Sequence, residues 1–183
     1  MIKLSRDFYA NDTLTVAKQL LGTYLIHVVD GQEKIGKIVE VEAYIGPHDL
    51  ASHASKGITP RTTIMYGPPG YAYVYLIYGM YYCMNVVTRE AGYGSAVLIR
   101  ALEPIKNLTE RTQGPGLLCK AMQINKTLNG HDLLSDNLYV ACANDAPNFT
   151  IVSRPRIGVA YAKEWAEKPF RFYIAGNPYI SKK

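Results

Sequence analysis

The strongest constraint on the fold of this chain is the run of residues 39–45, in which apolar and polar side chains alternate. Side chains of a β-strand point alternately to the two faces of a sheet. The polar face of this run therefore carries Glu40, Glu42 and Tyr44, and apolar residues occupy the other face. Gly46-Pro47 then breaks the pattern. We expect a strand that leads directly into a loop, with two carboxylates and an aromatic ring on one side.

The loop that follows this strand carries His48, Asp49 and His53. Two interpretations of the strand and loop are open from these residues alone. In the plain interpretation, the strand lies at a sheet edge with a solvated acidic face, because glutamate is rarely buried without a partner. In the functional interpretation, a carboxylate, a stacking ring and a histidine together hold a flat molecule and activate water beside it.

A metal site is a third interpretation of the same region. Its candidate ligands are Glu42, His48, Asp49 and His53. The two histidines lie on a loop, however, and their spacing matches no standard zinc pattern. We therefore predict neither a metal nor any other cofactor.

Residues 71–87 predict a β-hairpin with an unusual tip. Strands over residues 71–77 and 81–87 meet near Tyr78-Gly79, where Gly79 supplies the positive φ that a tight turn needs. The tip also carries Met80. Either this tip is an exposed wedge or it folds back onto its own domain. The pattern alone slightly favours the second, because apolar residues in turns usually find a core.

Tyrosine is unusually frequent, with 15 residues against 4 Phe and 1 Trp. Tyr71, Tyr73 and Tyr75 fall on one face of the first strand of this hairpin. Because tyrosine combines a ring that stacks with a hydroxyl that stays wet, the excess suggests a binding surface. The net charge of +5 favours a polyanionic partner.

Strands outnumber helices in the remaining pattern and several are joined by hairpins, which indicates an α+β fold. We expect one domain over residues 1–183, built from a mostly antiparallel curved sheet with a few surrounding helices and the protruding β-hairpin. The other expected elements are a helix over 14–21, a hairpin of strands 24–29 and 34–45, strands over 95–104, 138–142, 150–153 and 170–174, a helix near 114–122 and a helical turn over 162–166.

Cysteine usage and hydropathy bear on the compartment. The 3 cysteines are an odd number and form no Cys-x-x-Cys pair, which argues for a reducing cytoplasm. The N-terminus has no apolar core of signal-peptide length, and no apolar run approaches the length of a membrane span. We expect a soluble cytoplasmic protein without a membrane partner.

Five long motifs, which together run through most of the chain, resemble the alkyladenine (3-methyladenine) DNA glycosylase family. They are residues 39–47 (VEVEAYIGP), 73–85 (YVYLIYGMYYCMN), 98–104 (LIRALEP), 114–119 (GPGLLC) and 164–173 (EWAEKPFRFY). The segment between Pro104 and Gly114 is shorter than in longer members of the family.

The resemblance implies a DNA repair enzyme of base excision. Such an enzyme flips an alkylated or deaminated purine nucleotide out of duplex DNA, hydrolyses the N-glycosidic bond and leaves an abasic site, without lyase activity. We expect it to act as a monomer, associated with the nucleoid if the source is prokaryotic. The implied residues are Glu42 as general base; Tyr44, His53, Tyr75, Asn85 and Arg100 around the target nucleotide; and Tyr78, with Met80 beside it, as the wedge in the DNA.

The main alternative is a non-catalytic nucleic-acid-binding module that stacks bases on its tyrosines. Glu42 favours the enzyme, because a carboxylate near phosphates brings nothing to a pure binder. Glu40 lies two residues before Glu42 on the same face, and we expect its replacement by glutamine to matter much less.

Overall fold

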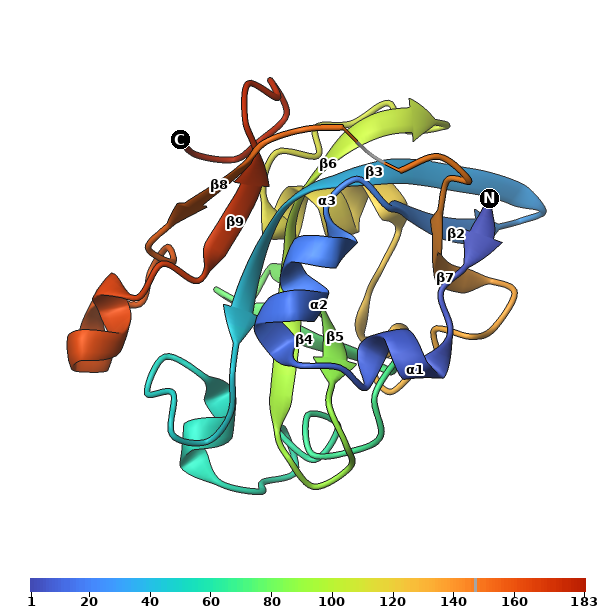
Figure 1. Cartoon of the computed structure of the whole chain (residues 1–183). Helices are drawn as coiled ribbons and strands as arrows, with labels where there is room; N and C mark the ends of the chain where they lie inside the picture. The colour runs from blue at the N-terminus through green and yellow to red at the C-terminus, as the bar shows by residue number, and fades with distance from the viewer. Residues whose placement is uncertain (147) are drawn as a thin grey trace.

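The computed structural model describes residues 1–146 and 148–183 and shows a curved, open nine-stranded sheet with helices around it (Figure 1). Every strand pair is antiparallel, so the predicted α+β class is confirmed. The elements are β1 (Ile2–Lys3), α1 (Arg6–Tyr9), α2 (Thr13–Leu20), β2 (Tyr24–Val29), β3 (Gln32–Tyr44), η1 (His53–Lys56), β4 (Ala72–Ile77), β5 (Tyr81–Thr88), β6 (Ser95–Lys106), α3 (Pro115–Met122), η2 (Lys126–Leu128), β7 (Leu138–Cys142), β8 (Ile151–Arg154), η3 (Ala160–Glu167) and β9 (Arg171–Ile174).

The long strand β3 lies in the middle of the sheet, so the edge-strand interpretation is wrong. The main strand order is β1-β7-β2-β3-β6-β5-β4, and the β8–β9 pair joins β3 separately. One edge of β3 pairs first with β2 and then, from Glu40 to Glu42, with β9. The other edge pairs with β6, with register shifts on both sides of Glu40. Figure 1 shows β9 (red) beside β3 (blue), so a late segment of the chain meets the acidic part of β3.

The apolar face of β3 belongs to the main hydrophobic core. Val39, Val41 and Ala43 are fully buried there, together with side chains from α2 and α3. The helix α2 begins after Asp12, whose side chain accepts a hydrogen bond from the N–H of Thr15 and so caps the first turn. Because the apolar residues face this core, the polar side chains of β3 point to the opposite side of the sheet.

Both predicted hairpins are present. The turn between β4 and β5 has φ of 54° at Tyr78 and 68° at Gly79, the positive values that the commonest tight hairpin turns require. Its tip is exposed, with 85% of Tyr78 and 67% of Met80 accessible, so the tip does not fold onto its own domain. Tyr71 precedes β4 and lies against the guanidinium of Arg6, 4.8 Å from its ring centroid, rather than with the tyrosines of the strand.

Several short elements differ from the expectation. The sequence patterns missed β1, α1 and η2, which have 2, 4 and 3 residues. His53, expected on a loop, begins the 3-10 turn η1. The expected helical turn near Trp165 is the longer segment η3, interrupted by a positive φ at Lys163. No helix in the described part of the chain is long and apolar enough to cross a membrane.

Candidate active site

A cavity of about 470 Å³ opens between β3, the β4–β5 hairpin and the segment before η3. This size lies within the range of about 300–1,000 Å³ that is usual for small-molecule sites. The structure brings seven of the eight predicted site residues to the cavity wall, and Met80 lies outside it. The seven are Glu42, Tyr44, His53, Tyr75, Tyr78, Asn85 and Arg100.

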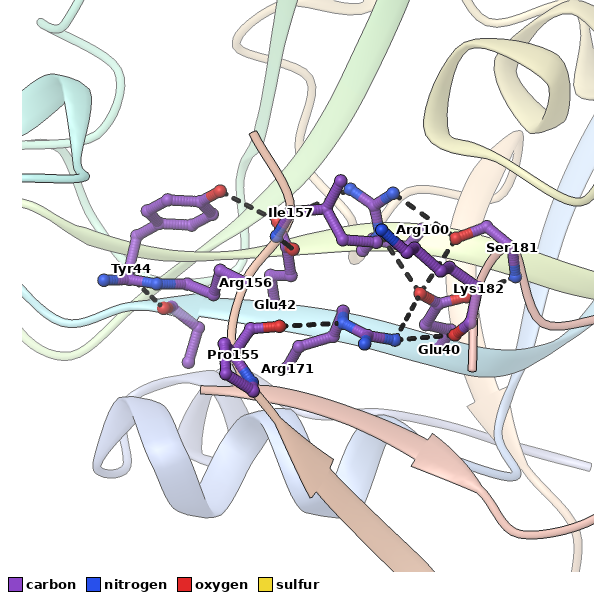
Figure 2. Close-up of polar contacts among 11 residues, drawn as sticks. Glu40, Glu42, Tyr44, Arg100, Pro155, Arg156, Ile157, Arg171, Ser181 and Lys182 are labelled. Carbon is purple, nitrogen blue, oxygen red and sulfur yellow. Dashed lines mark hydrogen bonds and ion pairs between the residues drawn. The ribbon is translucent and has the colours of Figure 1, made fainter. Parts of the chain in front are cut away.

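The carboxylate of Glu42 is completely buried and held from three directions (Figure 2). The hydroxyl of Tyr44 donates to Oε1 over 2.8 Å, and the main-chain N–H of Ile157 donates to Oε2 over 2.7 Å. The Nη1 of Arg100 lies 3.5 Å from Oε1. A carboxylate has about four acceptor positions, so these contacts orient Glu42 and still leave capacity to accept a proton from a molecule in the cavity.

Arg100 links Glu42 to a second buried carboxylate. Its Nε donates to Oε1 of Glu40 over 3.2 Å. Burial opposes the charge of Arg100, but Glu42 and Glu40 outweigh burial, and together they raise the pKa of the guanidinium. Arg100 is therefore a fixed cation at the inner end of the cavity, with one carboxylate on each side.

Aromatic rings form another part of the cavity wall, which we call the aromatic wall. The rings of Tyr73 and Tyr75 lie 5.4 Å apart, and the ring of His53 lies 4.6 Å from that of Tyr75. Burial, helped by the charge of Arg61, lowers the pKa of His53 to about 4, and burial raises the pKa values of both tyrosines. The wall is therefore uncharged at neutral pH. Electron-rich ring faces of this kind attract a flat cationic group such as an alkylated purine.

Tyr44 makes contacts beyond the stacking surface that the sequence predicts. Its hydroxyl is used by Glu42, and burial raises the pKa of this phenol well above its ordinary value. The guanidinium of Arg156 lies 4.8 Å from the ring centroid. Tyr44 is therefore packed against one cation while its hydroxyl orients the carboxylate.

The loop residues that were considered as metal ligands have other partners in the structure. Asp49 is fully buried, and its two oxygens accept from Arg156 over 2.5 and 2.8 Å. His48 packs edge-on against Trp165, with ring centroids 5.6 Å apart. Within residues 1–146 and 148–183, no group of three or more His, Cys, Asp or Glu side chains is arranged to hold a metal ion.

Two features of the site were missed by sequence reasoning. The N–H of Ile157 is a main-chain donor, so its residue type carries no signal, and the sequence patterns gave Arg156 beside it no place in the site. Gly116 was read only as part of a helix start. A Cβ at Gly116 would lie 2.8 Å from the Tyr81 side chain, so glycine is required for α3 to close this side of the cavity.

The fold and the cavity define a class of protein. A buried carboxylate–arginine pair and an aromatic wall line one cavity, and an exposed aromatic residue of the hairpin tip lines the same cavity. Enzymes that act on a base extruded from nucleic acid need such a combination, because the base must be enclosed while its place in the stack is opened.

Comparison with known proteins identifies the family within this class. The family model for methylpurine-DNA glycosylase (MPG) matches residues 7–178, and the chain belongs to this family. A Legionella pneumophila (strain Corby) protein is 67% identical over 182 residues, covering 100% of both chains. An Anaeromyxobacter dehalogenans (strain 2CP-1 / ATCC BAA-258) protein is 52% identical, covering 99% of this chain and 86% of its own. Both relatives carry the name "Putative 3-methyladenine DNA glycosylase". The family resemblance predicted from the motifs is confirmed.

Proposed function

We propose that this DNA glycosylase binds duplex DNA with a damaged purine, flips that nucleotide into the cavity and hydrolyses its N-glycosidic bond. The observation that carries the proposal is the buried Glu42 carboxylate, which is paired with Arg100 and lines the same cavity as the aromatic rings. A base inside a duplex cannot be reached, so it must leave the stack before it can be attacked. The products are a free base and an abasic site.

The chemistry follows from the charges at the inner end of the cavity. As the bond between C1′ and the base nitrogen breaks, its electron pair leaves with the base and the sugar becomes oxocarbenium-like. Water adds to C1′ and gives its proton to Glu42, which acts as general base and also stabilises the sugar cation. Tyr44 and Ile157 hold the carboxylate in place, since both donate to its oxygens.

Recognition is divided between the wall and the hairpin tip. Tyr75 and His53 offer ring faces to the purine. Asn85 is buried at the cavity wall, with its Nδ2 donating to the carbonyl of Tyr73 over 3.2 Å, and we assign it to the purine edge where guanine carries its exocyclic amino group. Tyr78, exposed at the rim, takes the place of the flipped nucleotide in the stack, with Met80 beside it.

We also propose that the enzyme acts as a monomer and is monofunctional, which means that it removes the base but does not cleave the DNA strand. A lyase of this type needs an amine that forms a Schiff base with the sugar. The described residues that line the cavity include no lysine. The basic balance of the chain, with a net charge of +5, serves the phosphates of the DNA.

The test uses duplexes that each contain one hypoxanthine, ethenoadenine or methylated purine. We expect free base from at least one duplex, and strand breaks only after alkali has cleaved the abasic sites. Strand breaks without alkali would contradict the monofunctional part of the proposal. Tight binding to all duplexes without any base release would instead support the non-catalytic binding module.

A further inference from the structure

The C-terminal segment after β9 reaches the buried side of the active site. The main-chain N–H of Ser181 donates to Oε2 of Glu40 over 2.5 Å, and its hydroxyl donates to Oε1 over 2.9 Å (Figure 2). The carbonyl of Lys182 accepts from Nη1 of Arg171 over 2.7 Å. The family model matches the chain only to residue 178, so these contacts come from residues beyond the matched stretch.

These contacts complete the environment of Arg100. Each nitrogen of its guanidinium has a separate partner in the structure. Nε donates to Glu40 over 3.2 Å, Nη2 donates to the Ser181 hydroxyl over 3.3 Å, and Nη1 lies 3.5 Å from Glu42. A planar guanidinium that is held at all three nitrogens cannot turn about its axis.

From this arrangement we infer that Ser181 is a positioning residue for catalysis, which acts on Glu42 through Glu40 and Arg100. The inference rests on the proposed function. Ser181 lines no part of the cavity, so it does not contact the damaged base. Its hydroxyl bridges Glu40 and Arg100, and this bridge sets where the positive charge lies relative to the catalytic carboxylate.

The effect on the reaction follows from geometry. Glu42 must face the sugar as its positive charge develops, and small misplacements of catalytic groups lower reaction rates strongly. Without the Ser181 hydroxyl, Nη2 of Arg100 loses its protein partner, and the guanidinium can move toward either carboxylate. The chemical step should slow, while the aromatic wall and the hairpin tip that bind the DNA stay as they are.

The experiment compares three variants in the full chain: Ser181→Ala, Ser181→Thr and Lys183→Ala. Ser181→Thr keeps the hydroxyl and the N–H. Lys183→Ala changes an exposed side chain in the same segment. For each, we would measure single-turnover base release, the Kd for a lesion-containing duplex and the thermal unfolding midpoint.

We expect Ser181→Ala to slow base release by about 10-fold, as loss of a hydrogen bond to a charged group would, with Kd unchanged within about 2-fold. Ser181→Thr should recover most of the rate, and Lys183→Ala should match the wild type. A wild-type rate of base release in Ser181→Ala would overturn the inference. A slower rate would also overturn it if the variant bound DNA correspondingly more weakly, or if the rate recovered at temperatures well below the unfolding midpoint. Failure of the wild type itself to release any base would instead count against the proposed function.

Discussion

Glu40 and Glu42 stand two residues apart on one face of β3, and both side chains are completely buried, yet their surroundings differ. Glu40 accepts four hydrogen bonds, from Arg100, Arg171 and both groups of Ser181, and it does not line the cavity. Glu42 accepts two hydrogen bonds, has one arginine nearby and lines the cavity. Burial alone therefore does not distinguish the two carboxylates. Spare acceptor capacity beside an open space does, and it supports the proposed role of Glu42 as general base.

The backbone of β3 contributes to this difference. Register shifts flank Glu40 where β3 pairs with β6, and β9 pairs with β3 at the same place. This pairing brings Arg171 within 3.3 Å of Glu40. Glu42 also lies next to β9, but its carboxylate meets the loop that carries Ile157 and the end of the cavity. One strand thus presents one carboxylate that is engaged by the surrounding protein and one that lines the cavity.

The largest effect that tests this comparison is expected from Glu42→Gln. The change keeps the shape of the side chain but removes the charge and the proton acceptor. Single-turnover base release should fall by about 10²–10⁴-fold, the usual contribution of general base catalysis, while DNA affinity is retained. Arg100 keeps Glu40 as a partner, so stability should change little.

A matched control for this variant is Glu33→Gln, on the same strand but in an exposed ion pair with Lys106. It should release base at the wild-type rate. If Glu42→Gln cleaves almost as fast as the wild type, or loses activity only because it fails to bind or fold, the assignment of Glu42 is wrong.

Glu40→Gln should act mainly on the stability of the fold. The structure does not support the use of this variant as a control without an effect of its own. The carboxylate of Glu40 is buried between Arg100 and Arg171, and the amide would leave Arg171 without its carboxylate partner and Arg100 with Glu42 alone. Removing one partner of a buried ion pair costs about 3–5 kcal/mol of unfolding free energy. Urea unfolding measures this loss. An unfolding free energy within about 1 kcal/mol of the wild type, the size typical of an exposed pair, would contradict the structural role of Glu40.

Tyr78→Ala tests the contribution of the hairpin tip to DNA binding, as distinct from the chemistry in the cavity. A base-stacking ring contributes about 1–3 kcal/mol, so duplex binding and base release should both weaken by that amount. The loss should be smaller on single strands or mismatched sites, where the stack is already weak. The control is Ile105→Ala, which removes another exposed apolar side chain away from the cavity. An equal loss on single- and double-stranded substrates would speak against a wedge.

The smallest expected effect concerns His53 and pH. Burial, with a contribution from Arg61, lowers its pKa from 6.5 to about 4, so protonation favours the unfolded chain. The stability that neutral His53 provides is complete above pH 6.5 and is lost as the pH falls from 6.5 to 4. Because the ring is only half-buried, we expect protonation of His53 to lower the unfolding free energy by about 1–2 kcal/mol over this pH range. His53→Gln should flatten the unfolding free energy over this range, and an unchanged slope would contradict the assignment.

Local patterns in the chain were enough to place most of the framework. The alternation over residues 39–45 correctly put Glu40 and Glu42 on one face, and strands 24–29 and 138–142 agree with β2 and β7 at both ends. The turn at Gly79 needed only the preference of glycine for positive φ. These features depend on neighbouring residues, so the sequence reveals them directly. The family motifs then singled out seven residues that the fold brings to one cavity.

The alternating pattern treats the two glutamates alike and the family resemblance singles out Glu42, but only the tertiary structure shows how their surroundings differ. Glu40 is held by Arg171 and Ser181, which follow it by 131 and 141 residues, and Glu42 is held by the N–H of Ile157, 115 residues later. Contacts between residues so far apart in the sequence depend on how β9 and the C-terminal segment pack against β3. A main-chain donor also cannot be recognised from the type of its residue. The exposure of Tyr78 was also decided by the tertiary structure. A bulky residue in a turn is buried or exposed according to which other parts of the fold lie beside it.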